Sequence, residues 1–212
     1  MDNAEFDAAL IASAFALAAE RGWSGVSVAQ AARDAGLPLA LARRRFPGRC
    51  AVLLRFGSQA DQAALTGAAD EGSHRDRLFD ILMRRIDFLQ RHRPGVLALI
   101  RTLPADPATA LTLAAASLCS MGWMLEGAGI SSRGLGGRLR SKGLLAVWLW
   151  TLRAWQDDES EDLAPTMAAL DQALARADEA AGWLGLGRAP AEPPASGGAT
   201  EPPPLPPAEP PA

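Results

Sequence analysis

The chain has 212 residues, a mass of 22.2 kDa and a formal net charge of −3, and 49% of its residues are hydrophobic. These values allow one ordinary domain, or a small domain packed on a larger one, with ample material for a core. Cys50 and Cys119 are too few and too far apart for a disulfide framework or a zinc site, so we expect buried free thiols. We recognise no run of about eighteen uncharged apolar residues and no signal peptide at the acidic start, and therefore expect a cytoplasmic protein without a transmembrane segment.

The N-terminal sequence predicts three consecutive helices. Apolar residues recur at helical spacing in residues 3–21, and a glycine follows them. Ser27 with Gln30 three positions later has the pattern of a capping box, which predicts a second helix that ends at Gly36. Pro38 suits the first turn of a short third helix, which a Pro-Gly pair then stops.

Two short helices joined through a glycine turn form a helix-turn-helix, whose second helix can enter the major groove of DNA. Residues 27–57 carry six arginines and one acid, so positive charge is concentrated there although the whole chain is net negative. Phosphate contacts require such a concentration. We therefore expect double-stranded DNA as a partner, contacted by Ser27, Gln30, Pro38, Leu39, Arg43, Arg44, Arg45 and Arg49.

The same segment resembles the N-terminal domain of TetR-type transcriptional regulators. The resemblance covers roughly the first quarter of the chain and rests on Gly22-Trp23, Val26-Ser27-Val28, Ala31, Ala35-Gly36-Leu37 and Phe46-Pro47-Gly48-Arg49. The sequence differs from the family pattern in having Arg43 at the place of a backbone-contacting tyrosine, Leu41 at the place of a threonine or serine, and Arg49 at the place of a lysine. The resemblance implies an all-α fold with a helix-turn-helix head and a helical body that binds a small effector and dimerises.

The sequence after the third helix predicts a helical body and a tail. Further helices are expected at residues 48–70, 73–93, 94–103, 108–126 and 135–156, with a last helix that carries Leu163, Met167, Leu170 and Leu174 on one face. Ser73 with Asp76, and Asp106 before Pro107, have the pattern of helix starts. The segment 108–126 is apolar nearly all round, which predicts burial on several sides. We expect residues 1–48 to form the head, 49–186 the body and 187–212 a disordered, proline-rich tail.

An apolar pocket is predicted in the body. Met121, Trp123 and Met124 are the candidates for its lining, because flexible methionines and aromatic walls suit hydrophobic ligands; the same spacing also fits a plain core. We find no nucleophile beside a base, no metal-ligand spacing and no phosphate-cradling glycine loop after a strand. Neither an enzyme nor a metal or cofactor site is therefore expected.

An apolar seam in residues 135–156 is predicted to pack against a partner helix. Its members are Leu145, Trp148, Leu152 and Trp155, at intervals of 3, 4 and 3 residues. The TetR resemblance implies that this seam and the last helix, with Met167, Leu170 and Leu174, form the interface of a homodimer. Such a dimer places two heads about one turn of DNA apart, which implies a palindromic operator. The resemblance to TetR-type regulators implies in addition a repressor that is controlled by an apolar small molecule or a lipid.

A second resemblance concerns about a fifth of the chain. Its residues are Arg140-Ser-Lys-Gly-Leu-Leu-Ala-Val-Trp148, Asp157-Asp158-Glu159-Ser160 and Thr166-Met-Ala-Ala-Leu-Asp171, which are similar to the TetR-fold lipid-binding proteins of ubiquinone biosynthesis. This similarity implies an alternative function, the presentation of an isoprenoid intermediate to membrane-associated enzymes. Two features favour the regulator: the arginine-rich segment 27–57, and the lack of a membrane-docking amphipathic pattern after Trp183.

Overall fold

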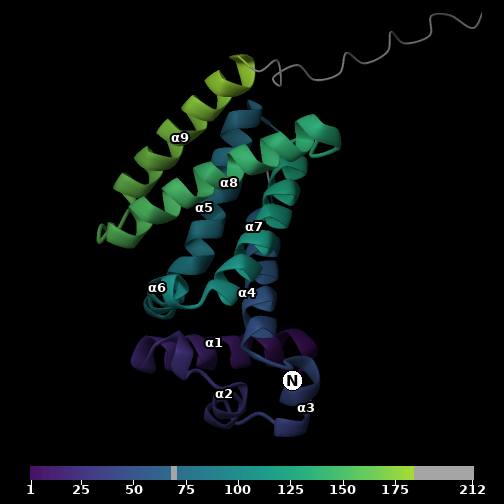
Figure 1. The fold of residues 1–212 in the computed structure, drawn as a ribbon, viewed down its shortest axis with the longest axis vertical. Coiled ribbons are helices and arrows are strands. Elements are labelled where there is room, and N and C mark those ends of the chain that lie inside the picture. The colour runs from purple at the N-terminus through teal and green to yellow at the C-terminus, as the bar shows by residue number, and fades with distance from the viewer. Residues whose placement is uncertain (68–70, 184–212) are drawn as a thin grey trace, which may run out of the picture.

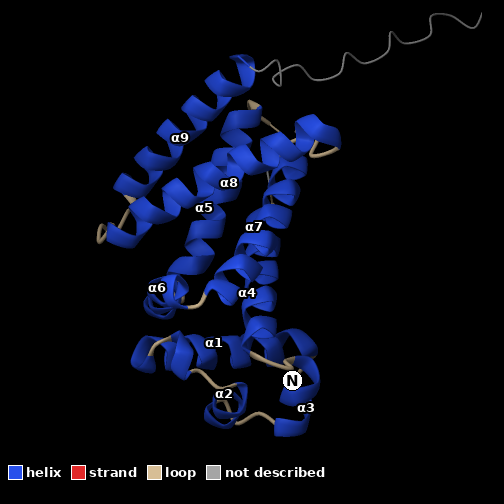
Figure 2. Cartoon of the chain, in the orientation of Figure 1, coloured by secondary structure: helices blue, strands red, loops and turns tan. Residues whose placement is uncertain are grey.

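The structure is a computed structural model that describes residues 1–67 and 71–183 of the chain. Within these residues it is helical without a strand, so the expected all-α class is confirmed (Figure 2). In chain order the helices are α1 (Asn3–Arg21), α2 (Val28–Asp34), α3 (Leu39–Arg45), α4 (Arg49–Leu65), α5 (His74–Gln90), α6 (Arg93–Thr102), α7 (Pro107–Gly127), α8 (Gly134–Asp157) and α9 (Ala164–Trp183), with short 3₁₀ helices η1 (Trp23–Gly25) and η2 (Leu103–Ala105). The predicted tail, residues 187–212, lies outside the described residues.

Figure 1 shows two stacked units. The helices α1, α2 and α3 form the lower unit, which we call the head, and α4 to α9 form the body above it. The helix α4 begins beside α3 and rises into the body, while α6 lies across α1. Head and body are therefore joined twice, by the chain through α4 and by the packing of α6 on α1.

The starts of α1, α5 and α7 are capped by side chains. A capping box between Asp2 and Glu5 begins α1, and the expected box between Ser73 and Asp76 begins α5. The Asp106 carboxylate caps α7 as expected, because it accepts a hydrogen bond from the backbone N–H of the third helical residue at 3.1 Å.

The predicted capping box at the start of α2 is wrong. The Ser27 side chain makes no capping hydrogen bond, and the Gln30 amide donates instead to Asp34 Oδ1 at 2.6 Å. A side-chain amide that is bonded one turn further along its own helix cannot serve the N-terminal backbone. Gly36 does adopt the left-handed conformation expected after this helix, with φ of 65°.

An aromatic cluster extends from the core of the head into the body. Trp23 is 1% exposed and packs against Phe15, with ring centroids 5.4 Å apart. Phe15 lies 4.2 Å from Phe56 of α4 and 5.8 Å from the ring of His92, which precedes α6. Burial among these rings, and then the charge of Arg91, lower the pKa of His92. The cluster gives the two units a continuous apolar contact.

The backbones of α6 and α1 approach each other so closely that a side chain would not fit between them. A Cβ atom at Gly95 of α6 would lie 2.2 Å from the backbone oxygen of Phe15 and 2.8 Å from its carbonyl carbon. Glycine has no Cβ, so it permits this approach. The position of the body on the head therefore depends on one residue that has no side chain.

The helix α7 is less enclosed than its sequence predicts. Leu111 and Trp123 are 74% and 65% exposed, so the expected burial on several sides is wrong. The expectation that the chain lacks a long uncharged apolar run is also wrong, because residues 107–125 carry no charge and α7 is long and apolar enough to cross a membrane by length and composition. One side of α7 packs against α4, α5 and α8, which makes it a wall of the body.

The apolar seam of α8 packs inside the protomer, so its assignment to a dimer interface is wrong for the buried members. Trp148 is 3% exposed, and Trp155 is fully buried and donates its indole N–H to Gln90 Oε1 of α5 at 2.8 Å. Leu170 and Leu174 of α9 are buried as well, and Met167 is half-buried. The 3-4-3 spacing identifies an apolar face but does not tell which helix covers it.

One carboxylate organises the acidic turn between α8 and α9. Asp158 accepts four hydrogen bonds, from the backbone N–H and the hydroxyl of Ser160 and from the same two groups of Thr166. Burial raises the pKa of Asp158, but these hydrogen bonds lower it by more, to about 2. The ionised carboxylate therefore stabilises the start of α9.

The close approach at Gly95 leads to a stability prediction. We expect Gly95→Ala to lower the free energy of unfolding by roughly 1–3 kcal/mol, because the added methyl collides with backbone that cannot rotate away. Urea unfolding followed by circular dichroism measures this loss. The control is Gly143→Ala in α8, where a Cβ meets nothing within 4 Å, so this variant should be unchanged or up to about 1 kcal/mol more stable. Equal changes in the free energy of unfolding for the two variants would contradict the close packing of α6 on α1 at Gly95.

The turn at Asp158 leads to a prediction about pH. The folded-state pKa of about 2 lies below the ordinary value of 3.8, so the carboxylate contributes stability above about pH 4 and loses it as the pH falls toward 2. We expect Asp158→Asn to be less stable than wild type at neutral pH, with a difference that narrows below about pH 4. Urea unfolding at several pH values checks this, with Asp157→Asn as the exposed control. If the stability difference between wild type and Asp158→Asn stayed constant with pH, the low pKa of Asp158 would be refuted.

Candidate functional site

The helix-turn-helix lies at the end of the molecule farthest from α9 (Figure 2). The turn is fixed by backbone hydrogen bonds, since the N–H groups of Gly36 and Leu37 donate to carbonyl oxygens of α2 at 3.0 and 2.7 Å. Buried Leu37 and Ala42 anchor the turn and α3 to the head. The start of α3 is open to solvent, where Pro38 and Leu39 are exposed. The structure thus presents α3 as a surface helix on a fixed support.

The basic residues around α3 divide into two groups: arginines that are exposed to solvent, and arginines that bond within the protein. Arg43 and Arg44 are exposed, and so is Arg33 of α2, which the sequence analysis counted as charge without naming it as a contact. Arg43 is also held near the helix end, because it donates to the backbone oxygen of Pro47 at 2.5 Å. Among the other predicted contacts, Ser27 is exposed and Gln30 is half-buried.

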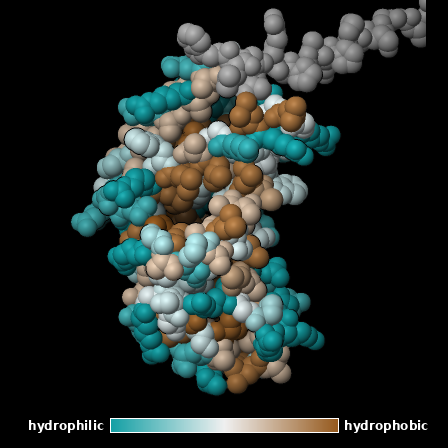
Figure 3. All heavy atoms as spheres, in the orientation of Figure 1, coloured by the Kyte–Doolittle hydropathy of each residue, from teal (hydrophilic) through white to brown (hydrophobic). Residues whose placement is uncertain are grey.

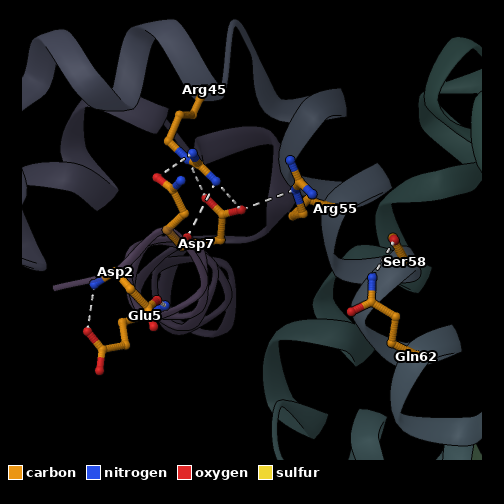
Figure 4. A network of polar contacts seen from close by, with 8 residues as sticks. Asp2, Glu5, Asp7, Arg45, Arg55, Ser58 and Gln62 are labelled. Atoms are coloured by element: carbon orange, nitrogen blue, oxygen red, sulfur yellow. Dashed lines mark hydrogen bonds and ion pairs between the residues drawn. The ribbon is translucent and has the colours of Figure 1, made fainter. Parts of the chain in front are cut away.

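Arg45 faces inward and contacts α1, so its prediction as a DNA contact is wrong (Figure 4). Its Nε donates to Asp7 Oδ1 and one terminal nitrogen donates to Asp7 Oδ2, both at 2.7 Å, while the other donates to Asn3 Oδ1 at 2.8 Å. The hydrogen bond with Asp7 raises the pKa of Arg45. Arg55 of α4 adds a second ion pair to Asp7 at 3.2 Å. This network joins α1, α3 and α4, so it orients the surface helix.

Arg49 also has a structural position instead of the predicted DNA contact. Its guanidinium donates to the backbone oxygens of Trp23 and Ser24 at 3.2 and 3.0 Å, and its side chain is partly buried. It thus holds the start of α4 on η1. A charge count along the sequence cannot distinguish arginines that bond within the protein from those that are exposed.

The body contains an apolar cavity of about 410 Å³ between α4, α5, α6, α7 and α8. Its walls include Phe56, Leu89, Leu99, Leu113, Trp123 and Leu145. Figure 3 shows hydrophobic side chains gathered over α8 and beside α7, around a hollow in the surface of the body. Most ligand pockets have volumes between about 300 and 1,000 Å³ and mainly apolar walls, so this cavity has the size and lining of a small-molecule site.

The lining differs from the one that the sequence predicted. Of the three candidates, Trp123 lines the cavity, whereas Met121 and Met124 are completely buried in the core and are not part of its wall. Leu145, Trp148 and Leu152, which were assigned to the dimer seam, line the cavity instead. The cavity wall also includes Cys119, which is exposed, as is Cys50; the expectation of buried thiols is therefore wrong.

A buried ion pair forms the polar part of the cavity wall. Arg85 of α5 is 5% exposed and lies 3.0 Å from Asp61 Oδ1 of α4, while the Ser120 hydroxyl of α7 donates to Asp61 Oδ2 at 2.6 Å. The Arg85 guanidinium stacks 4.7 Å from the ring centre of Trp148. Its Nε and one terminal nitrogen are buried without a hydrogen-bond partner among the described residues. Burial lowers the pKa of Arg85, and the nearby carboxylate partly offsets this effect.

This pair was not predicted from the sequence, although the sequence contains a signal for it. Arg85 follows Leu78 and Leu82 and precedes Leu89 at the intervals of one apolar helix face. A charged residue at such a position is costly to bury unless it is paired, so it marks a polar site inside the body. Over residues 1–67 and 71–183, no group of three or more His, Cys, Asp or Glu residues is arranged to hold a metal ion.

Comparison with known proteins identifies the fold. No family model matches the sequence, and no curated protein matches it. The structure is similar to the TetR transcriptional regulator from Nitrosomonas europaea ATCC 19718, with a TM-score of 0.67 and 20% identity, over 82% of this chain and 99% of that one. It is also similar to a tetR-family regulator from Streptomyces coelicolor (TM-score 0.58, 22% identity, 87% of each chain) and to a TetR regulator from Rhodococcus sp. RHA1 (0.58, 17%, 83% and 97%). The chain therefore has the fold of the TetR-type transcriptional regulators, a helix-turn-helix head on a helical body.

Proposed function

We propose that the protein is a DNA-binding transcriptional regulator. The observation that carries this proposal is the exposed α3, with Arg43 and Arg44 on its surface and Arg33 on the preceding helix. Side chains of this kind neutralise phosphates and position a helix in the major groove. The inward ion pairs of Arg45 hold α3 in a fixed orientation on α1, which reduces the ordering cost of binding.

The homodimer is proposed to form through the outer faces of α8 and α9. Trp150 of α8 is 53% exposed and borders a shallow groove with Arg153 and with Ala168 and Ala169 of α9. Small side chains let helices of two protomers approach closely, and a large aromatic residue supplies apolar area. We propose this exposed surface as the dimer interface in place of the residues predicted from the sequence, which are buried or half-buried within the protomer. Two heads related by a twofold axis imply a palindromic operator.

Ligand control is proposed to act through the two helices that touch the head. The cavity is lined by Phe56 of α4 and by Val96 and Leu99 of α6, while α6 also packs on α1 through Gly95. If α6 can take two positions, one that suits DNA binding and one that does not, a ligand can bind the protein more tightly in one of them. The DNA affinity then changes by the difference between the two ligand-binding free energies. A molecule that shifts α6 and its contact with α1 would release the protein from its operator, which is the behaviour of a repressor.

A first experiment tests DNA binding by fluorescence anisotropy with the protein's own promoter region and an unrelated DNA. We expect selective, salt-sensitive binding, and we expect Arg43→Ala/Arg44→Ala to weaken it and to lower the salt slope by about 3–4 for a dimer, since four phosphate contacts are lost. Arg45→Ala should instead lower the melting temperature, because it leaves Asp7 with one ion pair fewer.

The matched control removes the same charge elsewhere. Arg133 and Arg138, near the start of α8 at the opposite end of the molecule, are exposed, and their double alanine variant should retain both affinity and salt slope (Figure 1). Equal weak binding of wild type to both DNAs would contradict the regulator. In that case the lipid-presenting function becomes the leading one, and mass spectrometry of lipids extracted from the purified protein would test it.

A second experiment tests the dimer by light scattering coupled to size-exclusion chromatography. We expect a wild-type dimer and a monomeric Trp150→Glu variant, because a buried charge without a partner opposes association. Leu111→Glu is the control, since this residue is 74% exposed near the start of α7 and should leave the dimer intact. A monomeric wild type would contradict the proposed dimer. A Trp150→Glu variant that remains dimeric would show that the dimer forms through another surface.

A further inference from the structure

The buried pair of Arg85 and Asp61 specifies the chemistry of the ligand. We propose that the cavity binds an uncharged, mainly apolar molecule whose carbonyl-type oxygen accepts hydrogen bonds from Arg85. The regulatory role of this ligand rests on the proposed function, whereas its binding does not depend on DNA.

Arg85 carries more hydrogen-bond donors than its protein partners use. The ion pair with Asp61 engages one terminal nitrogen, at 3.0 Å, and the stacked Trp148 ring covers a face of the guanidinium. The Nε and the other terminal nitrogen are buried without an acceptor among the described residues, at a position on the cavity wall. Buried donors without acceptors are costly, so a ligand that brings an oxygen to them gains the hydrogen bonds that the protein does not make.

The charge of the site favours a neutral acceptor over a carboxylate. Asp61 already balances the charge of Arg85, and the hydroxyl of Ser120 donates to its second oxygen at 2.6 Å, which holds this carboxylate in place. A ligand carboxylate on the same guanidinium would add a second negative charge near Asp61, inside an apolar cavity. A cationic ligand would be repelled by the positive charge of Arg85. A ketone, ester or aromatic carbonyl supplies the lone pairs without adding charge.

Three probes of nearly equal shape separate these possibilities. They are 2-acetylnaphthalene, which carries a carbonyl; 2-naphthoate, which carries a carboxylate; and 2-ethylnaphthalene, which has no acceptor. Trp123 and Trp148 line the cavity, so quenching of tryptophan fluorescence reports occupancy of the free protein. We expect the ketone to bind about tenfold more tightly than 2-ethylnaphthalene, the gain of about one hydrogen bond to a charged group, and the carboxylate to bind most weakly.

Two variants test the source of this selectivity. In Arg85→Met/Asp61→Leu/Ser120→Ala the cavity remains neutral and the three polar side chains of this cluster no longer supply a donor, so the ketone and 2-ethylnaphthalene should bind equally. In Asp61→Asn the charge of Arg85 is unbalanced, so 2-naphthoate should become the preferred probe. The control Arg84→Met changes the neighbouring residue of α5, which is not part of the cavity wall, and should behave as wild type. Circular dichroism verifies that each variant is folded.

The proposal is overturned if 2-naphthoate binds wild type as tightly as the ketone, if none of the probes binds, or if the ketone preference survives in Arg85→Met/Asp61→Leu/Ser120→Ala. These outcomes concern the cavity alone. Addition of the ketone to the complex of wild type with promoter DNA then tests regulation separately, through the loss of anisotropy that a released operator produces.

Discussion

The contact between α6 and α1 is the constraint on which the rest of the structure depends. At Gly95 the two helices approach so closely that a Cβ atom would overlap backbone, and next to this contact Phe15 packs against Phe56 and His92. Packed interiors transmit displacement because they contain little free volume. The helices α6 and α4, which pack on α1 through Gly95 and Phe56, also supply walls of the cavity. The proposed ligand cavity and the contact with the head therefore share Phe56.

Several arginines of this protein bond to groups within the chain. Arg45 and Arg55 bind Asp7, Arg49 binds two backbone oxygens, and Arg85 binds Asp61 within the body. Because these side chains are engaged, the proposed DNA contact relies on few arginines in each protomer. A dimer doubles that number, so the proposed operator affinity depends on the α8–α9 surface as much as on α3.

The sequence predicts local structure here better than it predicts which surfaces meet. The capping signals at Ser73 and Asp106 predicted their helices correctly, because a cap depends on neighbours in the chain. The seam containing Trp148 and Trp155 was correctly identified as apolar, but its partners are helices of the same chain. The pairing of Asp61 with Arg85 spans α4 and α5, and the inward orientation of Arg45 depends on α1. No local pattern contains that information.

The single carboxylate of Asp7 has a consequence for how such a protein can change. It is almost fully buried and binds one arginine from α3 and another from α4. Loss of this one carboxylate would remove a negative charge from the head and release two positive ones toward solvent. A single substitution would therefore exchange rigidity of the surface helix for general attraction to nucleic acid, and so trade selectivity among sequences for strength of binding.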